Sequence, residues 1–375
     1  MLPLLLLLPA AAALAYQAIA LLASLVFVER SRMRRAKPLA ACTPSVSILK
    51  PVHGLDEALD AAIRSHLAQD YPGYELLIGV QDSDDPALPV IRAAFAAYPA
   101  AQARLVVCST KSPNAKVGTL IDLAREARGE ILIVNDADIK VPADYVRRVA
   151  AKLANPKNGL VTCLYRASSS TSAGLFESIV IATDFIPSTL VAPLVGIDEF
   201  GLGSTLGFRR ADLDSIGGFA AIQEYIADDY QLAKRIHALG RSCIMSEVVV
   251  DTHMADPGWK DVWRHQLRWA RTIRVSRPGG YLGLPVTHAG VWAVANLAAG
   301  NVGAATALWL ARSTMGAVSG FLVLRHWPSL LAAPFLPLWD LWAFAVWLAG
   351  YFSRTAWWRG RRITLSSDGR IQETR

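Results

Sequence analysis

The chain has 375 residues, of which 53% are hydrophobic and 18% charged, and its formal net charge is +7. This composition is too apolar for an ordinary soluble protein, and the middle of the chain is too polar for a pure bundle of membrane helices. The basic residues gather beside the apolar segments, which favours anionic lipid headgroups over nucleic acid as their partner. The sequence shows no RNA- or DNA-binding motif, so it favours a membrane-anchored enzyme.

Residues 1–28 predict an N-terminal transmembrane helix, because Leu2 to Val28 carries no charge and can span about 30 Å of hydrocarbon. A cleaved signal peptide is the competing interpretation, but the run is long and starts without basic residues. Residues 29–44 follow as a basic linker with Arg30, Arg32, Arg34, Arg35 and Lys37. Basic residues stay on the cytoplasmic side, so we expect the chain from about residue 30 onward to be cytoplasmic.

Residues 45–280 predict one cytoplasmic domain of the α/β class. Strands at 45–49, 74–80, 104–108 and 131–134 alternate with helical patterns at 56–68 and 116–127. Such alternation predicts a Rossmann-like, mostly parallel sheet with helices on both faces. Ligands of such sheets lie beyond the carboxyl ends of the strands, where Gly54, Asp82, Asp136 and Asp138 follow.

The strand Ile131 to Val134 ends in Asn135-Asp136-Ala137-Asp138. In an extended chain Asp136 and Asp138 leave on the same side, so they can face one divalent metal and leave room for phosphate oxygens. The competing interpretation is that they cap the turn that follows.

Three later segments complete the domain. Residues 201–210 are rich in glycine, which allows the backbone to approach a ligand closely. Asp228 and Asp229 open a helix, where a carboxylate serves either as a helix cap or as a general base. Trp259 to Arg274 predicts a basic amphipathic helix with tryptophans, of the kind that lies in a membrane interface.

Residues 281–352 predict a C-terminal membrane region with two spans, Thr287 to Ala311 and Trp327 to Phe352. Between them, Met315 to Leu324 is short and predicts a re-entrant or interfacial piece. Residues 353–375 predict a basic cytoplasmic tail. Asp340 inside the last span either has a function or pairs with an arginine in the bundle.

The successive motifs resemble those of the ceramide glucosyltransferase family, and most of all its bacterial members that glycosylate hopanoid lipids. They are residues 47–56 (SILKPVHGLD), 80–86 (VQDSDDP), 135–138 (NDAD), 227–230 (ADDY) and 265–269 (HQLRW). The resemblance implies a membrane-bound glycosyltransferase with the GT-A fold, located in the bacterial inner membrane.

The resemblance also implies roles for single residues. Asp82 would contact the uracil of a UDP-sugar, Asp138 with Asp136 would bind Mg or Mn, and Asp229 would be the catalytic base. Arg268 and Trp269 match the family's (Q/R)-x-x-R-W motif, whose first position here is His265. The further substrate-binding residues implied are Lys50, Gly54, Asn114 and Lys116, the last two in a segment that lacks the proline and both later asparagines of N-P-K-V-N-N.

The implied reaction moves one sugar, N-acetylglucosamine or glucose, from a UDP-sugar to a hydroxyl of a lipid acceptor, either a hopanoid polyol or ceramide. A single displacement with one base predicts inversion at the anomeric carbon. Two alternatives stay open: a polysaccharide synthase, which needs more spans for a polymer channel, and a non-enzymatic nucleotide-sugar sensor. The implied partners are the UDP-sugar, the lipid acceptor and the bilayer.

Overall fold

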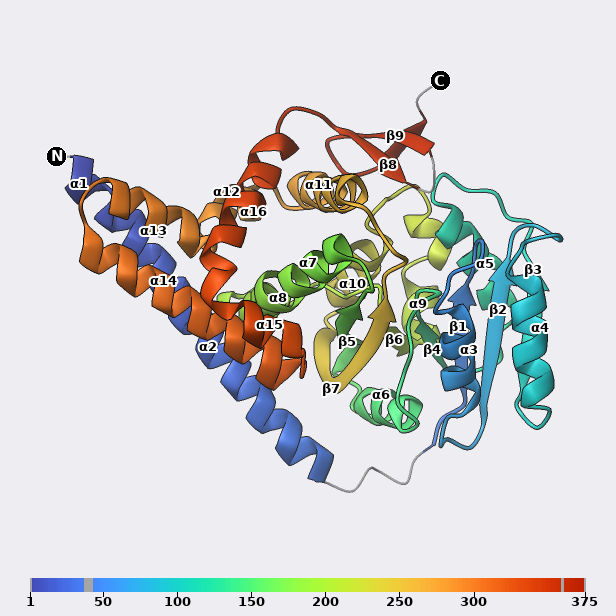
Figure 1. Cartoon of the computed structure of the whole chain (residues 1–375). Coiled ribbons are helices and arrows are strands. Elements are labelled where there is room, and N and C mark those ends of the chain that lie inside the picture. Colours follow the sequence, from blue (N-terminus) through green and yellow to red (C-terminus); the bar gives the residue numbers. More distant parts are fainter. Residues whose placement is uncertain (1, 37–42, 359–360, 374–375) are drawn as a thin grey trace. The chain divides into compact units, whose positions relative to one another are not determined.

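The computed structural model describes residues 2–36, 43–358 and 361–373 (Figure 1). Lys37 of the expected linker therefore lies outside the described residues. The chain forms two compact units. We call residues 33–168 and 197–255 the sheet unit, and residues 1–32, 169–196 and 256–375 the helical unit.

The sheet unit is built on seven strands in the order β3-β2-β1-β4-β6-β5-β7. Its elements in chain order are β1 (Val46–Pro51), α3 (Leu59–Leu67), β2 (Tyr74–Val80), α4 (Leu88–Ala97), β3 (Ala103–Val107), α5 (Ala115–Glu126), β4 (Ile131–Val134), α6 (Tyr145–Leu153), β5 (Asn158–Ser168), β6 (Leu206–Arg209), α9 (Arg210–Ser215), η3 (Phe219–Ile222), α10 (Asp228–Ala238) and β7 (Ser242–His253). Only β6 runs antiparallel to its neighbours β4 and β5. The predicted α/β class with a mostly parallel sheet is confirmed.

Both faces of the sheet are buried at its central strands β1, β2 and β4, which is why β4 and most of β2 are apolar without alternation. On one face Ile48 packs with Ile63 of α3 and Val149 of α6. On the other face Leu49 packs with residues of α5 such as Leu120. Helices on both faces leave the ends of the strands as the open edge, where loops can carry functional groups.

Among its described residues, the helical unit contains three helices that are long and apolar enough to cross a membrane: Leu7–Ala36, Ser172–Val195 and Trp327–Gly350. Its elements are α1 (Leu2–Leu5), α2 (Leu7–Ala36, whose last turn belongs to the sheet unit), α7 (Ser172–Val180), η1 (Ile181–Phe185), α8 (Ile186–Val191), η2 (Ala192–Val195), α11 (Trp259–Ser276), α12 (Pro278–Gly283), η4 (Leu284–Val286), α13 (Ala289–Ala298), α14 (Val302–Ala317), η5 (Val318–Val323), α15 (Trp327–Ala332), η6 (Ala333–Phe335), α16 (Leu336–Gly350), β8 (Thr355–Trp358), β9 (Arg361–Leu365) and β10 (Ile371–Glu373).

The structure corrects two expectations in the N-terminal and middle parts of the chain. Helix α2 continues to Ala36, so the basic residues expected in a linker form its last turns. The apolar helix Ser172–Val195 was expected inside the cytoplasmic domain 45–280, yet it belongs to the helical unit. Glu177 and Asp184 interrupt its apolar pattern, which hides it from a search for uncharged runs.

The C-terminal region also differs from the expectation. Thr287 to Ala311 is not one helix: α13 and α14 are separated at Gly300, whose φ is +83°. Met315 to Leu324 is no separate piece, because α14 and η5 run through it. Part of the tail forms a three-stranded antiparallel sheet, β10-β9-β8. Arg359 of the tail lies outside the described residues.

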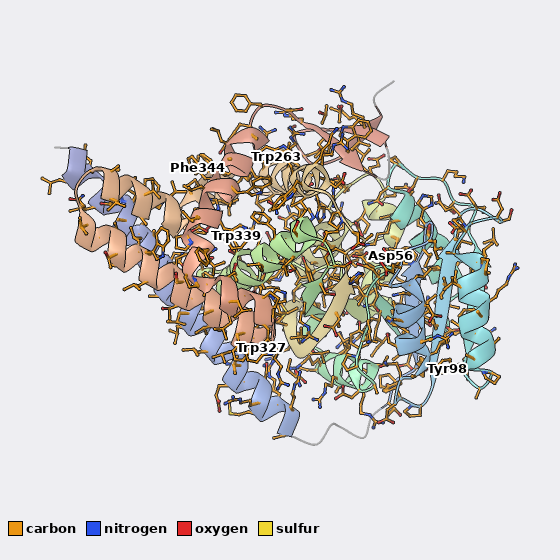
Figure 2. All side chains as sticks on the ribbon, viewed as in Figure 1. Asp56, Tyr98, Trp263, Trp327, Trp339 and Phe344 are labelled. Carbon is orange, nitrogen blue, oxygen red and sulfur yellow. The ribbon has the colours of Figure 1, made fainter. Side chains whose placement is uncertain are left out.

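Helix α11 packs on its own unit through its tryptophans (Figure 2). The ring of Trp263 lies 5.1 Å from that of Trp342 on α16, edge to face. Phe176 of α7 contacts Trp339 at the same centroid distance of 5.1 Å. Trp263 is thus a packing residue, whereas Trp259 contacts Phe176 at a centroid distance of 5.3 Å and is still 51% exposed. The interfacial location of this helix stays a prediction.

Asp340 pairs with Arg312 inside the helical unit, so the paired alternative for this residue is the one observed. The Arg312 Nε donates to Asp340 Oδ1 at 2.9 Å, and each side chain is 2% exposed. Asp340 Oδ2 also accepts the backbone N–H of Gly290 at 2.8 Å, and Arg312 Nη1 donates to the carbonyl of Thr183 at 2.9 Å. The pair therefore joins α13, α14, α16 and η1.

Asp340→Leu should lower the free energy of unfolding by about 3–5 kcal/mol, because it leaves the Arg312 charge buried without its partner. The double variant Arg312→Met with Asp340→Leu should recover most of that loss, since it removes both charges at similar volume. Thermal unfolding in detergent measures both. A single variant as stable as the wild type would contradict the pairing.

Candidate active site

Strands β2, β1 and β4 lie side by side and parallel, so their carboxyl ends share one edge of the sheet. Asp82, Gly54 and Asp136 follow these ends, as the sequence predicts. The Gly54 N–H donates to Asp85 Oδ2 at 3.0 Å, and the φ of Gly54 is +73°, which favours glycine. Asp85 is buried and shapes this loop, while Asp82 is exposed and available to a ligand. Sequence reasoning singled out Asp82 and missed Asp85.

Lys50 lies beneath this edge and is fully buried. Its Nζ donates to the carbonyls of Asp136 at 2.8 Å and Ile139 at 3.3 Å. Burial lowers the pKa of Lys50 to about 8, against the opposing effect of the Asp138 and Asp136 charges. Lys50 therefore positions the loop after β4, and it has no exposed surface for the substrate contact that the family resemblance implies.

Asn114 is likewise fully buried and structural. Its Oδ1 accepts the N–H of Val117 at 3.3 Å and so caps α5, while its Nδ2 donates to the carbonyl of Tyr225 at 2.8 Å. These bonds hold the start of α5 against the segment before α10. Asn114 thereby positions Lys116, two residues later, and its substrate contact stays a prediction.

Lys116 pairs with two acidic residues, Asp136 after β4 and Asp228 at the start of α10. Its Nζ lies 2.8 Å from Asp136 Oδ1 and 3.1 Å from Asp228 Oδ2. Burial lowers the pKa of Lys116, but the charges of Asp136 and Asp228 outweigh burial and raise the pKa above its usual value. Lys116 is therefore a permanent cation that draws the loop after β4 and the start of α10 together.

Asp229 begins α10 beside this cluster. Its Oδ1 accepts the backbone N–H of Tyr230 at 2.7 Å. Burial, and then the charge of Asp228, raise the pKa of Asp229 to about 6. A carboxylate with such a pKa is ionised at neutral pH and is a stronger proton acceptor than an ordinary aspartate, as a general base requires.

Gly203 lies directly against the charged cluster. A Cβ at this position would be 3.0 Å from Asp136 Oδ2 and 3.7 Å from both Asp229 Oδ2 and Lys116 Nζ. The Asn135 Nδ2 fixes this turn by donating to the carbonyl of Ser204 at 2.6 Å. Within the glycine-rich segment, Gly203 is therefore the position where a side chain would enter the space beside the charged groups.

Gly203→Ala should reduce kcat/KM by about 100-fold, because small displacements of reacting groups have effects of that size. The free energy of unfolding should fall by no more than about 1–3 kcal/mol, the range for overpacking. Gly279→Ala is the matched control, since its Cβ would meet no atom within 4 Å. Wild-type kcat/KM in the Gly203 variant would show that the turn does not border the reacting groups.

Asp136 and Asp138 lie in a turn and not in an extended chain, since the Ile139 N–H donates to the Asp136 carbonyl at 3.3 Å. The Thr252 hydroxyl at the end of β7 donates to Asp138 Oδ2. Burial and the charge of Asp136 raise the pKa of Asp138. No sequence motif pointed to Thr252, because this contact joins residues far apart in the chain.

These carboxylates fit a metal that is shared with the substrate. In the described part of the chain, no three His, Cys, Asp or Glu side chains are grouped to form a complete metal cage. Mg²⁺ is commonly held by one or two carboxylates together with substrate phosphates and water, which is the set available here. A bound cation would oppose the burial and the Asp136 charge that raise the pKa of Asp138.

His265, Arg268 and Trp269 lie on α11 of the helical unit. His265 Nδ1 is 2.6 Å from Oε1 of the buried Glu177, and its ring lies 4.7 Å from that of Trp269. Gln266 points elsewhere, with its Oε1 accepting the indole N–H of Trp342 at 2.7 Å. His265 therefore takes the first position of the motif, oriented by Glu177, a partner that sequence reasoning missed.

Several known proteins are similar to this chain over part of its length. Ceramide glucosyltransferase 1 of Caenorhabditis elegans is 27% identical over 216 residues, which are 56% of this chain and 45% of that protein. Ceramide glucosyltransferase of Komagataella phaffii is 26% identical over 168 residues, 43% of this chain and 33% of that protein. Beta-monoglucosyldiacylglycerol synthase of Synechocystis is 26% identical over 200 residues, 52% of this chain and 40% of that protein. The chain thus spans less than half the length of these relatives.

The fold also matches a solved structure, the mannosyltransferase PcManGT from Pyrobaculum calidifontis in complex with GDP-Man and Mn²⁺. The TM-score is 0.54 at 21% sequence identity, with 88% of this chain and 99% of that chain covered. This similarity confirms the GT-A-like fold. The sequence profile of glycosyl transferase family 21 matches residues 5–371, and the chain therefore belongs to this family.

Proposed function

We propose that the protein transfers one sugar from a UDP-sugar to a hydroxyl of a membrane lipid, with inversion. The observation that carries this proposal is the group formed by Lys116, Asp136 and Asp229 around Gly203, at the open edge of a GT-A-like sheet. The named activities of the relatives, which act on ceramide and diacylglycerol, support a lipid acceptor with a free hydroxyl. The sugar is N-acetylglucosamine or glucose, and the lipid is a hopanoid polyol or ceramide.

Asp229 takes the proton from the lipid hydroxyl as that oxygen attacks the anomeric carbon. Its raised pKa and half-buried carboxylate suit this role. Lys116 holds Asp136 and Asp228 in place and offsets their charge, which keeps Asp229 ionised at neutral pH. A single displacement with one base leads to inversion.

Donor binding is assigned to the neighbouring strand ends. Asp82 would contact the uracil, Gly54 would allow a close approach of the backbone, and Asp138 with Asp136 would hold Mg or Mn. When bound, this cation would neutralise charge on the leaving diphosphate. The family motif adds three residues to the proposal. The guanidinium of Arg268 would contact the leaving group, the ring of Trp269 would contact the acceptor, and the imidazole of His265 would bind substrate.

The membrane setting is part of the same proposal. The three candidate spans support an integral membrane protein, and the arginines at the end of α2 favour a cytoplasmic sheet unit in a bacterial inner membrane.

The test is to incubate the purified chain in lipid nanodiscs with Mn²⁺, UDP-glucose or UDP-N-acetylglucosamine, and ceramide or a hopanoid polyol. Mass spectrometry should find lipid with one added sugar. A polymer would favour the polysaccharide synthase, and donor binding without any product would favour the sensor. Either result would overturn the proposed function.

The pH dependence follows from the pKa of Asp229. Because the base must be deprotonated, kcat/KM should fall about tenfold for each pH unit below about 6. Asp228→Asn should shift this fall in kcat/KM to lower pH, because it removes the negative charge of Asp228 that raises the pKa of Asp229. The positive charge of Lys116, no longer offset by Asp228, should then lower that pKa further. Initial rates at saturating metal give the profile. An unshifted fall in kcat/KM would assign the ionisation to another group.

A further inference from the structure

A cavity of about 550 Å³ lies beside Asp138 in the sheet unit. Its walls come from the start of α3, the loop after β4 and the carboxyl ends of β5 and β7. Its polar lining includes Glu57, Lys140, Arg166, Asp251 and His253 together with Asp138. This volume lies within the range of about 300–1,000 Å³ for small-molecule sites.

With Asp138 set aside for the metal of the proposed function, the remaining charges on these walls cancel. Arg166 Nη2 lies 2.6 Å from Asp251 Oδ1, and its Nε donates to the same oxygen at 2.8 Å. Apart from Asp138, the lining carries two formal positive charges, on Lys140 and Arg166, and two negative charges, on Asp251 and Glu57. A phosphate site needs an excess of positive charge, so this cavity suits an uncharged ligand.

The cavity lining contains both donors and acceptors of hydrogen bonds. His253 Nδ1 lies 3.2 Å from Ser168 Oγ, and its Nε2 lies 4.0 Å from Glu57 Oε2. The apolar lining consists of Ala58 and Ala61. Hydroxyl groups both donate and accept, so a ligand with many hydroxyls can satisfy such walls and an apolar one cannot.

The same wall is bonded to Asp138. The backbones of Asp251 and Lys140 exchange two hydrogen bonds of 2.8 and 2.9 Å, and the Thr252 hydroxyl donates to Asp138. A group held in the cavity is therefore next to Asp138. In our proposed function, Asp138 would bind the metal that contacts the diphosphate of the donor. The sugar of the donor is covalently attached to that diphosphate.

We propose that this cavity binds an uncharged polyhydroxylated group, and that Asp251 and His253 select which group is accepted. The inference rests on the proposed function. Two sources share this chemistry: the sugar of the donor and the hydroxylated head of a polyol lipid acceptor.

Titrations of Asp251→Asn and His253→Gln with UDP and with UDP-N-acetylglucosamine separate these sources. If the donor sugar occupies the cavity, the affinity of both variants for UDP stays unchanged, while their affinity for UDP-N-acetylglucosamine falls about tenfold. A loss of this size is expected when a hydrogen bond between the sugar and a charged side chain is removed. If the acceptor head occupies it, both affinities stay unchanged and the KM for the polyol lipid rises about tenfold. Asp70→Asn is the matched control, because Asp70 forms a 3.0 Å pair with Arg147 and lines no part of this cavity.

Unchanged UDP-sugar affinity and unchanged acceptor KM in both variants would overturn the inference while leaving the proposed function intact. If Asp251→Asn also weakens UDP binding or lowers the unfolding temperature, His253→Gln decides, because its side chain is 31% exposed at the rim. A wild-type protein that binds neither UDP nor UDP-sugar would overturn the proposed function together with the cavity.

Discussion

Asp229→Asn should abolish sugar transfer while the affinity for UDP-sugar stays close to that of the wild type. Asparagine keeps the shape of the side chain and cannot accept the proton, and removing a general base typically costs about 10²–10⁴-fold in rate. The donor-binding groups, Asp82 and Asp138, follow other strand ends and remain intact. Product formation per enzyme and UDP-sugar titration together measure the two quantities.

Asp214→Asn serves as the control for this variant, because Asp214 is an exposed aspartate on α9 of the same unit. It should transfer sugar at the wild-type rate. Transfer by the Asp229 variant at an undiminished rate would exclude Asp229 as the base.

Asp138→Ala should remove activity and metal-dependent UDP-sugar binding together. The metal ligand and the diphosphate site are the same in our proposal, so one substitution should affect both. We expect metal affinity to fall by at least about 100-fold. Mutating a residue that only hydrogen-bonds to a metal ligand already lowers affinity by up to about 100-fold, and this substitution removes the ligand itself. Titration of Mn²⁺ at fixed UDP-sugar, with and without a chelator, measures the effect.

Thr252→Val is a milder variant that tests the same site. It removes the hydroxyl that donates to Asp138 and keeps a similar side-chain volume. Its expected loss of metal affinity is about 10–100-fold, smaller than that of Asp138→Ala. Metal-dependent binding that survives in Asp138→Ala would move the metal to other residues.

The sequence was sufficient to predict strands β1 to β4 and the edge that carries the candidate site, whereas β5, β6 and β7 were not predicted. The uniformly apolar run Ile131–Val134 predicted a strand buried on both faces, and the parallel pairing of β1, β2 and β4 follows from the alternation with helices. Because parallel neighbours end at the same edge, residues far apart in the chain, such as Gly54 and Asp136, could be grouped in advance.

Side-chain burial and long-range contacts were not predictable in the same way. Lys50 and Asn114 stand in motifs beside functional positions, yet both are fully buried and bond to backbone groups. Thr252 reaches Asp138 only because β7 ends beside the loop after β4, a contact across 114 positions of the sequence. Such contacts depend on tertiary packing, which periodicity does not encode.

Two of the predicted membrane segments, at the N-terminus and from Trp327 onward, match candidate spans, but the predictions for Ser172–Val195 and for residues 287–311 were wrong for a related reason. The apolar helix that contains Glu177 and Asp184 was missed because a search for uncharged runs assumes that polar side chains face lipid. Here Glu177 is buried against His265 within the unit. Conversely, Gly300 divides an apolar run that is long enough for one span into two shorter helices.

The anomeric configuration of the product tests the proposed reaction most directly. After incubation of the wild-type protein with an α-linked UDP-sugar and the lipid acceptor, the coupling of the anomeric proton in the NMR spectrum of the purified glycolipid distinguishes the two outcomes. Direct displacement assisted by Asp229 predicts a β-linked sugar, and no product from Asp229→Asn. An α-linked product would contradict a single displacement with one base.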